Sequence, residues 1–156
     1  MSLSIQSVTK DNWRTLGNLK VREDQRNFVA PNLYSIAESQ FGFDMVDESH
    51  WELFSFGIYD GETPVGFFMY GYHFPHTKYQ AFIFRLMVDE NRQGKGYGKF
   101  GMEYMLEIFR QDERIQKVGI SYELENKVAR KLYASLGFVE TGEIQGEEAV
   151  AVLNLR

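Results

Sequence analysis

Gln93-Gly94-Lys95-Gly96-Tyr97-Gly98-Lys99 (QGKGYGK) is the stretch around which the rest of the chain is organised. It follows the apolar run Ala81 to Val88, which we predict to be a central strand buried on both faces, and it opens a helix over about residues 96–110. The first N–H groups of a helix have no intrahelical partner, and glycine lets a backbone approach phosphate oxygens without a Cβ in the way. Lys95 and Lys99 add positive charge beside the loop. The order strand, glycine-rich loop, helix therefore predicts a phosphate-binding loop.

Three other interpretations of this loop fit the surrounding sequence less well. Three alternating glycines argue against a turn with a purely structural role. Gly96 to Gly101 matches the G-x-G-x-x-G pattern of dinucleotide sites, and Glu123 lies where a ribose-binding acid belongs, but such a domain carries the loop after its first strand and needs several further βα units. Only 33 residues follow Glu123. A Walker loop is excluded because Phe100, rather than Ser or Thr, follows Lys99.

Periodicity and turn signals divide the remaining chain into short elements. Asp60-Gly61 predicts a hairpin turn, and Asn126 can cap a helix that ends before Gly137. We expect strands over 3–6, 52–59, 64–72, 81–88, 117–122, 138–144 and 147–155, helices over 11–20, 33–40, 96–110 and 127–136, and a connector over 41–51. The order β-α-α-β-β-β-α-β-α-β-β predicts an α/β fold, with a mixed, mostly antiparallel central sheet and flanking helices in one domain, residues 1–156.

Two of these helices show a clear apolar face. In the helix after the loop, the residues at i, i+3, i+4, i+7, i+8 and i+11 are Tyr97, Phe100, Gly101, Tyr104, Met105 and Ile108. In the helix after Asn126, the expected inner face is Val128, Ala129, Leu132, Tyr133 and Leu136. Both faces are predicted to pack on the sheet.

Composition excludes several classes of function. The formal net charge is −5 and no run of Lys or Arg exceeds two residues, which is the opposite of what nucleic-acid binding requires. No apolar run is long enough to span a membrane. The absence of cysteine excludes disulfides and thiolate sites and is compatible with the cytoplasm, where we expect the protein. The three histidines lack the spacing of a metal pair, so we predict no metal.

Two motifs, one in the glycine-rich loop and one that begins at Asn126, resemble those of a single family of enzymes. Gln93, Gly96 and Gly98 stand at the signature positions of Q/R-x-x-G-x-G/A, the coenzyme motif of the GNAT superfamily of N-acetyltransferases. Asn126 to Phe138 (NKVARKLYASLGF) is similar to that family's second motif, N-x-x-A-x-x-L-Y-x-x-L-G-F. The resemblance covers the whole chain, because the predicted element order is also that of the family. It implies that acetyl-CoA is the acetyl donor.

Less specific similarities point to bacterial spermine/spermidine (diamine) N-acetyltransferases. They lie in Val65 to Gly71, in Arg85 to Asp89 and in Gly142 to Glu147. They imply a small-molecule primary amine, such as a polyamine or diamine, as the partner that receives the acetyl group. Another amine, such as an amino acid, an aminoglycoside or a protein N-terminus, and a non-catalytic CoA-binding sensor stay open as alternatives. Homodimers are common in the family, and the final strands are candidates for such a contact.

The resemblance also implies roles for individual residues. The backbone of Met87 and Val88 would bind the pantetheine arm, with the Val88 N–H as oxyanion donor, and residues 93–99 together with Asn126 would hold the rest of the coenzyme. Tyr133 would give a proton to the leaving thiolate, because a phenol donates readily at neutral pH. Spacing alone favours a core tyrosine instead. Transfer would be direct, since no cysteine can carry the acetyl group.

The group that takes the proton from the amine is not evident from the sequence. Several of the similar enzymes carry an acid one residue before the position of Arg85, where this chain has Phe84. Candidate replacements are Glu123 at the end of the neighbouring strand and three acids from the region of the acceptor lip, Glu23, Asp24 and Glu38. None of the four is assigned.

Overall fold

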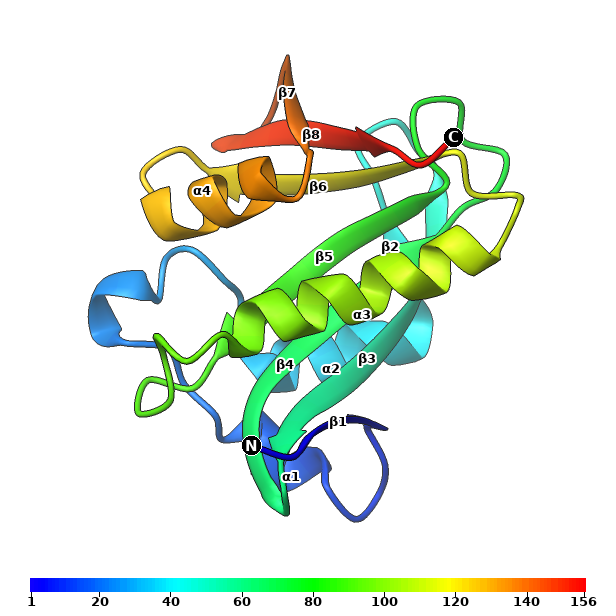
Figure 1. Ribbon diagram of the computed structural model, residues 1–156. Helices are drawn as coiled ribbons and strands as arrows, with labels where there is room; N and C mark the ends of the chain where they lie inside the picture. Colours follow the sequence, from blue (N-terminus) through cyan, green and yellow to red (C-terminus); the bar gives the residue numbers. More distant parts are fainter.

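Eight strands form one mostly antiparallel sheet, in the order β1-β3-β4-β5-β6-β8-β7 with β2 paired to β3, in the computed structural model of residues 1–156 (Figure 1). Only β5 and β6 run parallel. The strand bounds are Leu3–Ser7 (β1), Phe43–Asp44 (β2), His50–Asp60 (β3), Thr63–Tyr72 (β4), Ala81–Val88 (β5), Lys117–Glu123 (β6), Val139–Gln145 (β7) and Glu148–Asn154 (β8). The predicted fold class is confirmed.

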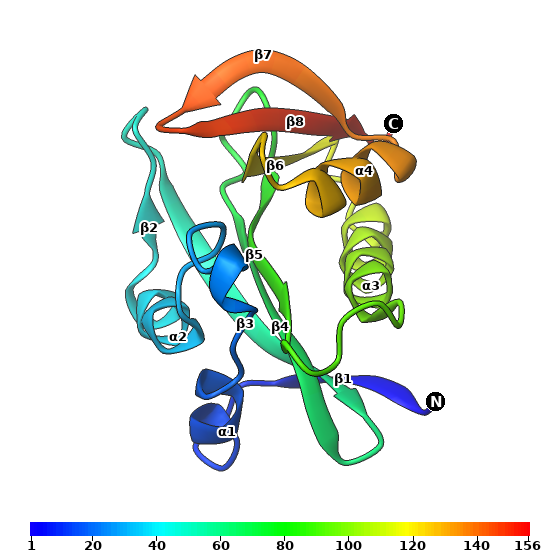
Figure 2. The same cartoon turned by 90° about the vertical axis from the view of Figure 1, so that its left-hand side faces the viewer.

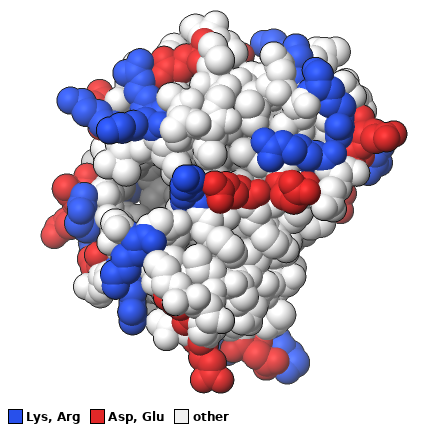
Figure 3. Space-filling view, in the orientation of Figure 1, with Lys and Arg blue, Asp and Glu red and all other residues white.

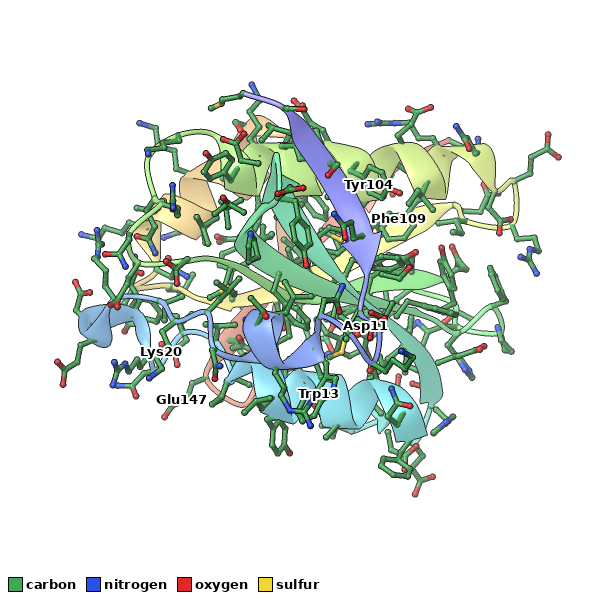
Figure 4. The ribbon with its side chains drawn as sticks, turned by 90° about the horizontal axis from the view of Figure 1, so that it is seen from below. Asp11, Trp13, Lys20, Tyr104, Phe109 and Glu147 are labelled. Carbon is green, nitrogen blue, oxygen red and sulfur yellow. The ribbon has the colours of Figure 1, made fainter.

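The helices cover the two faces of the sheet in pairs. Helices α1 and α2 lie on one face and α3 and α4 on the other (Figure 2). Seen from below, Trp13 on α1 lies on the opposite side of the strands from Tyr104 and Phe109 on α3 (Figure 4). The helix bounds are Trp13–Gly17 (α1), Asn32–Phe41 (α2), Tyr97–Gln111 (α3) and Lys127–Ser135 (α4), with a 3-10 turn η1 at Glu23–Gln25.

A separate core fills each face. Beneath α3 and α4 the buried side chains include Phe68, Ile83, Met105 and Phe109. Beneath α1 and α2 they are centred on Trp51, which is fully buried. Strand residues alternate between the two cores, so the parity of a residue in its strand tells which face it occupies.

The alternation breaks once in β5, at Phe84. Residue Met69 of β4 pairs with Arg85 and Tyr70 pairs with Ile83, so Phe84 has no partner and forms a bulge. Phe84 packs on Phe82 on the α2 face, and Arg85 also reaches α2. A bulge bends its strand and disrupts the local ladder. Two consecutive side chains therefore share one face.

Strands β5 and β6 separate at this bulge. Their parallel pairing covers only Ala81 to Ile83 on β5 and ends at Ile83 opposite Ile120. Beyond it, β6 keeps pairing with β8 up to Glu123, while β5 keeps pairing with β4 up to Val88. Figure 1 shows the two strands diverging toward the N-terminal end of α3. The sheet therefore carries a wedge-shaped gap in its centre.

The first helix is shorter than predicted. It ends at Gly17 instead of near Lys20, because the Leu16 carbonyl accepts a hydrogen bond from Asn32 Nδ2 of α2 at 2.9 Å. The backbone of Lys20 is bonded to the loop after β5: its N–H donates to Asp89 Oδ1 and its carbonyl accepts from the Glu90 N–H. These contacts depend on the tertiary structure, which helix periodicity does not report.

The connector predicted over 41–51 contains structure. It holds the short strand β2, and β3 begins at His50, two residues before the expected start. His50 Nδ1 lies 2.6 Å from Asp44 Oδ1, and Phe43 pairs with Trp51. Trp51, the centre of the core beneath α1 and α2, is therefore a strand residue.

The apolar face of α3 is rotated from the prediction, whereas the predicted inner face of α4 is confirmed except at Val128. In α3, Tyr104 is 38% exposed, and the buried residues are Tyr97, Gly101, Met102, Met105, Leu106 and Phe109. The sheet contacts α3 on the side of Met102 and Phe109, because aromatic residues of β4 pack there. In α4, Val128 is 76% exposed, since it lies in the first turn beside the gap. The left-handed Gly137 after α4 is confirmed.

Candidate active site

A cavity of about 730 Å³ occupies the gap between β5 and β6. It is lined from the α3 and α4 side by Leu86, Val88, Tyr122 and Tyr133, and from the α2 side by side chains that include Arg85 and Glu148. Because side chains of both faces line it, the cavity passes through the sheet at the gap. Figure 3 shows a hollow on the α3 and α4 side with Lys and Arg side chains around it.

The loop between β5 and α3 has seven consecutive backbone N–H groups without a partner in the chain, and six of its seven residues line this cavity. The backbone N–H groups of residues 93–99 make no hydrogen bond within the chain, and the first helical bond runs from the Phe100 N–H to the Gly96 carbonyl. Gly94 and Gly96 have φ of +79° and +86°, a region that residues with a Cβ rarely adopt. Unpaired donors at a helix N-terminus bind phosphate oxygens. The predicted function of this loop therefore fits its geometry.

Gln93 fixes the loop through its side chain. Its Nε2 lies 3.0 Å from the Val88 carbonyl and 2.8 Å from Gln25 Oε1. The amide thus ties the end of β5 to the start of the loop and to η1. The sequence pattern did not reveal this contact.

The other predicted coenzyme residues are placed unequally. Gly94, Gly96, Gly98, Lys99 and Asn126 line the cavity, whereas Met87 and Lys95 do not. Met87 is buried toward α2, with its Sδ 3.5 Å from Asn32 Nδ2. The Tyr97 side chain turns away to donate to Asp60 Oδ2 at 2.6 Å, so only its backbone is available to a ligand. Asn126 caps α4 by accepting from the Ala129 N–H.

The backbone of Val88 faces the gap. The Asp89 N–H donates to the Val65 carbonyl of β4, so Asp89 points to β4. Successive residues of a strand point their N–H and C=O groups to opposite edges, so those of Val88 point toward β6. The Gln93 contact to the Val88 carbonyl agrees with this direction. The N–H predicted as the oxyanion donor is thus on the open edge.

Tyr133 is 6% exposed and faces the same cavity from α4. Its ring lies 5.3 Å from that of Tyr122, and its hydroxyl makes no hydrogen bond within the chain. Burial, with smaller effects from Tyr122 and Glu148, raises the pKa of the Tyr133 hydroxyl. The hydroxyl therefore stays protonated and can donate into the cavity.

Carboxylates line the opposite wall of the cavity. Glu123 ends β6 and Glu148 begins β8, and the two are register partners. Arg85 also lines this wall, and its guanidinium contacts Glu38 Oε1 of α2 at 3.1 Å. Because Glu38 balances Arg85, the wall keeps the charge of two carboxylates.

A family model for the acetyltransferase (GNAT) family matches residues 13–138. The chain belongs to the GNAT family of acetyltransferases. It is an N-acetyltransferase that depends on acetyl-CoA as the donor. The acetyltransferase is 26% identical over 148 residues to the spermine/spermidine N(1)-acetyltransferase of Bacillus subtilis strain 168, and the match covers 92% of each chain. A probable spermine N(1)-acetyltransferase of B. subtilis subsp. natto has the same identity and coverage.

Solved structures share the fold of the acetyltransferase. The spermidine N-acetyltransferase of Vibrio cholerae, in complex with CoA and spermine, superposes with a TM-score of 0.70 at 17% identity, covering 99% of this chain and 96% of that one. The aminoglycoside acetyltransferase AAC(6')-Ib, in complex with coenzyme A, superposes with a TM-score of 0.72 at 15% identity, covering 98% and 95%. The two neighbours act on very different amines, so the fold leaves the acceptor open.

Of the acids considered as proton acceptors, the acetyltransferase brings only Glu123 to the cavity. Glu23 and Asp24 are exposed on η1, and Asp24 pairs with Arg22. Glu38 is held by Arg85. Sequence reasoning missed Glu148, although it lies two residues before the apolar Val150 and so shares its face.

Sequence reasoning also missed the segment between α1 and α2. Residues 25–31 and Val21 line the cavity, and this stretch carries no periodic pattern that would mark it. No helix of the acetyltransferase is both long and apolar enough to cross a membrane. The structure contains no group of three or more His, Asp or Glu side chains suited to a metal ion.

Proposed function

We propose that this acetyltransferase moves the acetyl group of acetyl-CoA directly to a primary amine of a polyamine or diamine, both substrates being bound together in the domain 1–156. The observation that carries the acceptor assignment is the pair of carboxylates on the cavity wall. Glu123 and Glu148 stand opposite each other on neighbouring strands, an arrangement of like charges that destabilises a sheet by itself. A ligand with two or more ammonium groups relieves that repulsion.

The donor side supports binding of a coenzyme with phosphates and amide groups. The unpaired N–H groups of residues 93–99 suit the pyrophosphate, and Lys99 lies beside them. The open edge of β5 at Val88 suits an amide-bearing arm that pairs as an added strand. When bound, acetyl-CoA supplies an activated acyl group, and the Val88 N–H and the Tyr133 hydroxyl lie on the same cavity to stabilise the charge that develops on oxygen and sulfur.

Primary alkyl amines are mostly protonated at neutral pH, since their pKa is about 10.4. A negatively charged wall therefore attracts the form of the substrate that is abundant in solution. The relatives from B. subtilis, which are named for spermine and spermidine, support the same acceptor class. The segment between α1 and α2 also lines the cavity and would contact the rest of the acceptor.

The test is thiol release from acetyl-CoA with spermine, spermidine and putrescine, compared with amino acids and aminoglycosides. Polyamines should give the highest kcat/KM, and spermidine should raise the Tm of the wild-type protein more than a monoamine of similar length does. A higher kcat/KM for an aminoglycoside would move the acceptor assignment to that class. CoA binding without turnover of any amine would change the functional assignment to that of a CoA-binding sensor.

The oligomeric state is a second part of the proposal. One structural neighbour, a V. cholerae spermidine N-acetyltransferase, was solved as a dodecamer. In this chain the edge strand β7 carries two exposed apolar residues, Val139 and Ile144. A homodimer that pairs this edge would cover both. Light scattering of the wild type and of Val139→Lys tests this: the substitution should give a monomer.

A further inference from the structure

The structure fixes the carboxylate of Glu148 beside the start of the gap. Its Oε1 accepts a hydrogen bond from Ser121 Oγ at 3.2 Å. Ser121 directly follows Ile120, the last residue of β6 that pairs with β5. The hydrogen bond thus fixes the carboxylate at the point where the two strands part.

Glu148 and Tyr133 reach the cavity from opposite faces of the sheet. Glu148 shares the parity of Val150, which packs in the core beneath α1 and α2. Tyr133 packs with Tyr122 in the core beneath α3 and α4. Both line the same cavity. The cavity that Val88 lines is therefore bordered by a carboxylate on one face of the sheet and by a hydroxyl on the other.

The surroundings of Glu148 suit a proton acceptor at neutral pH. Burial raises the pKa of the Glu148 carboxyl, Ser121 and Arg85 oppose that rise, and Glu123 adds to it. These are the charged and titratable groups that face it from β5 and β6, and Tyr133 faces it from α4. A carboxylate with a raised pKa is a stronger base than one in water.

We propose that Glu148 is the catalytic base that takes a proton from the acceptor amine. Phe84 cannot fill this role, although several similar enzymes carry an acid at its position. This inference rests on the proposed function, because it concerns the same cavity and the same reaction. Glu123 lies at the end of β6 without a hydrogen bond to orient it, and Glu38 is committed to Arg85. Glu148 alone combines burial, a fixed orientation and a place at the gap.

The proton balance of the step is complete with these two side chains. The ammonium gives one proton to the Glu148 carboxylate, and the neutral nitrogen forms its bond to the thioester carbon. The C–S bond breaks, and the thiolate takes the proton of the Tyr133 hydroxyl. The second N–H proton, on the cationic nitrogen of the new amide, returns to the Tyr133 oxygen. Glu148 releases its proton to solvent, so the products are the amide, CoA-SH and H⁺.

The experiment compares Glu148→Gln with the matched control Glu147→Gln. Glutamine keeps the size of the side chain and can still accept from Ser121, while Glu147 is exposed in the turn before β8. At neutral pH, kcat/KM for the amine should fall by about 10²-fold in E148Q and stay within about twofold in E147Q. CoA affinity should be the same in both variants, which shows that the fold and the donor site are intact.

The pH profile separates a base from a structural role. In the wild type, kcat/KM should reach a plateau above the pKa of Glu148, because the abundant ammonium form is used. In E148Q only free neutral amine can react, so the logarithm of kcat/KM should rise with unit slope up to the pKa of the amine, about 10.4. Should E148Q bind CoA poorly, Ser121→Ala provides the second test: it keeps the carboxylate and should keep the plateau with a lower kcat.

The outcomes distinguish the two proposals. A plateau in E148Q like that of the wild type would overturn the assignment of Glu148 and leave polyamine acetylation standing. Turnover of another amine in place of polyamines would overturn the acceptor class, and the same pH comparison with that amine would still decide Glu148. Absence of turnover with every amine would overturn both.

Discussion

The Tyr97 hydroxyl donates a hydrogen bond of 2.6 Å to Asp60 Oδ2, joining the first residue of α3 to the hairpin between β3 and β4. The contact fixes the direction in which the N-terminus of α3 points. This bond lowers the pKa of the Asp60 carboxyl, and it raises the pKa of the Tyr97 hydroxyl. A carboxyl with a lowered pKa in the folded state stabilises the fold above its ordinary pKa, and that contribution is lost as pH falls through the lowered value.

Tyr97→Phe should therefore lower Tm at neutral pH. The difference from the wild type should shrink as pH falls below the ordinary pKa of an aspartate, and it should be lost at the lowered pKa of Asp60, where the folded protein becomes protonated at this residue. Thermal melts followed by circular dichroism across this range measure the effect. Tyr104→Phe is the control, because Tyr104 lies on the same helix and its hydroxyl makes no bond to a carboxylate. A Tm difference independent of pH would show that the hydrogen bond is not its cause.

Gly98→Ala should weaken acetyl-CoA binding without harming the fold. A Cβ at this position would lie 3.8 Å from Val88 and 3.9 Å from Leu132, which is ordinary contact, and alanine favours a helix over glycine. The methyl group would project toward the cavity, so KM for acetyl-CoA should rise several-fold while Tm is unchanged or higher.

Gly101→Ala, one turn further along α3, should show the reverse. A Cβ there would approach Ile58 Cδ1 to 2.9 Å in the core, so Tm should fall and KM should not change. Loss of coenzyme affinity in both variants would indicate a general disturbance of α3 instead of a local role for Gly98.

Tyr133→Phe should lower kcat by about 10²-fold and leave the affinity for CoA within about twofold. The hydroxyl makes no hydrogen bond in the chain, so its removal should not change Tm. Steady-state kinetics with a saturating amine, together with calorimetric titration of CoA, provide both quantities. An unchanged kcat would assign Tyr133 to the core alone.

Loss of one partner of the ion pair between Arg85 and Glu38 should destabilise the protein more than loss of both partners. Its side chains are 20% and 15% exposed, so either charge alone would be left in a poorly solvated site. Glu38→Gln should cost about 2 kcal/mol of unfolding free energy. Replacing both residues by methionine should recover most of that loss, as measured by urea denaturation. A double variant as unstable as E38Q would show that the pair itself, and not the unpaired charge, sets the stability.

Local signals in the sequence were sufficient for most of the order of elements and for predicting a phosphate-binding loop. The apolar run of β5, the glycines of the loop and the cap at Asn126 act over a few residues, so pattern reveals them. The acetyl-CoA donor and the enzyme class follow from the same motifs. Strand ends were less well predicted, because β2 and the start of β3 depend on the contact of His50 with Asp44.

The acceptor side depends on registers that no local pattern encodes. Glu148 accepts from Ser121, which lies 27 residues earlier in the chain, and this contact follows from the pairing of β6 with β8. The end of α1 at Gly17 is set by Asn32 of the next helix, and the bulge at Phe84 by the pairing of β5 with β4. These features come from packing between distant segments, which explains why an acid could be sought at Phe84 while the one at position 148 was overlooked.

The bulge at Phe84 has a consequence for protein engineering. Because it turns Phe84 and Arg85 to one face and leaves Leu86 and Val88 on the other, the proposed acceptor and donor contacts on β5 occupy separate residues. A mutant library restricted to Phe84, Arg85, Ser121 and Glu123 would sample new acceptors while every residue that faces the coenzyme stays constant. Selection for altered substrate range could then proceed without a loss of donor affinity that must later be repaired.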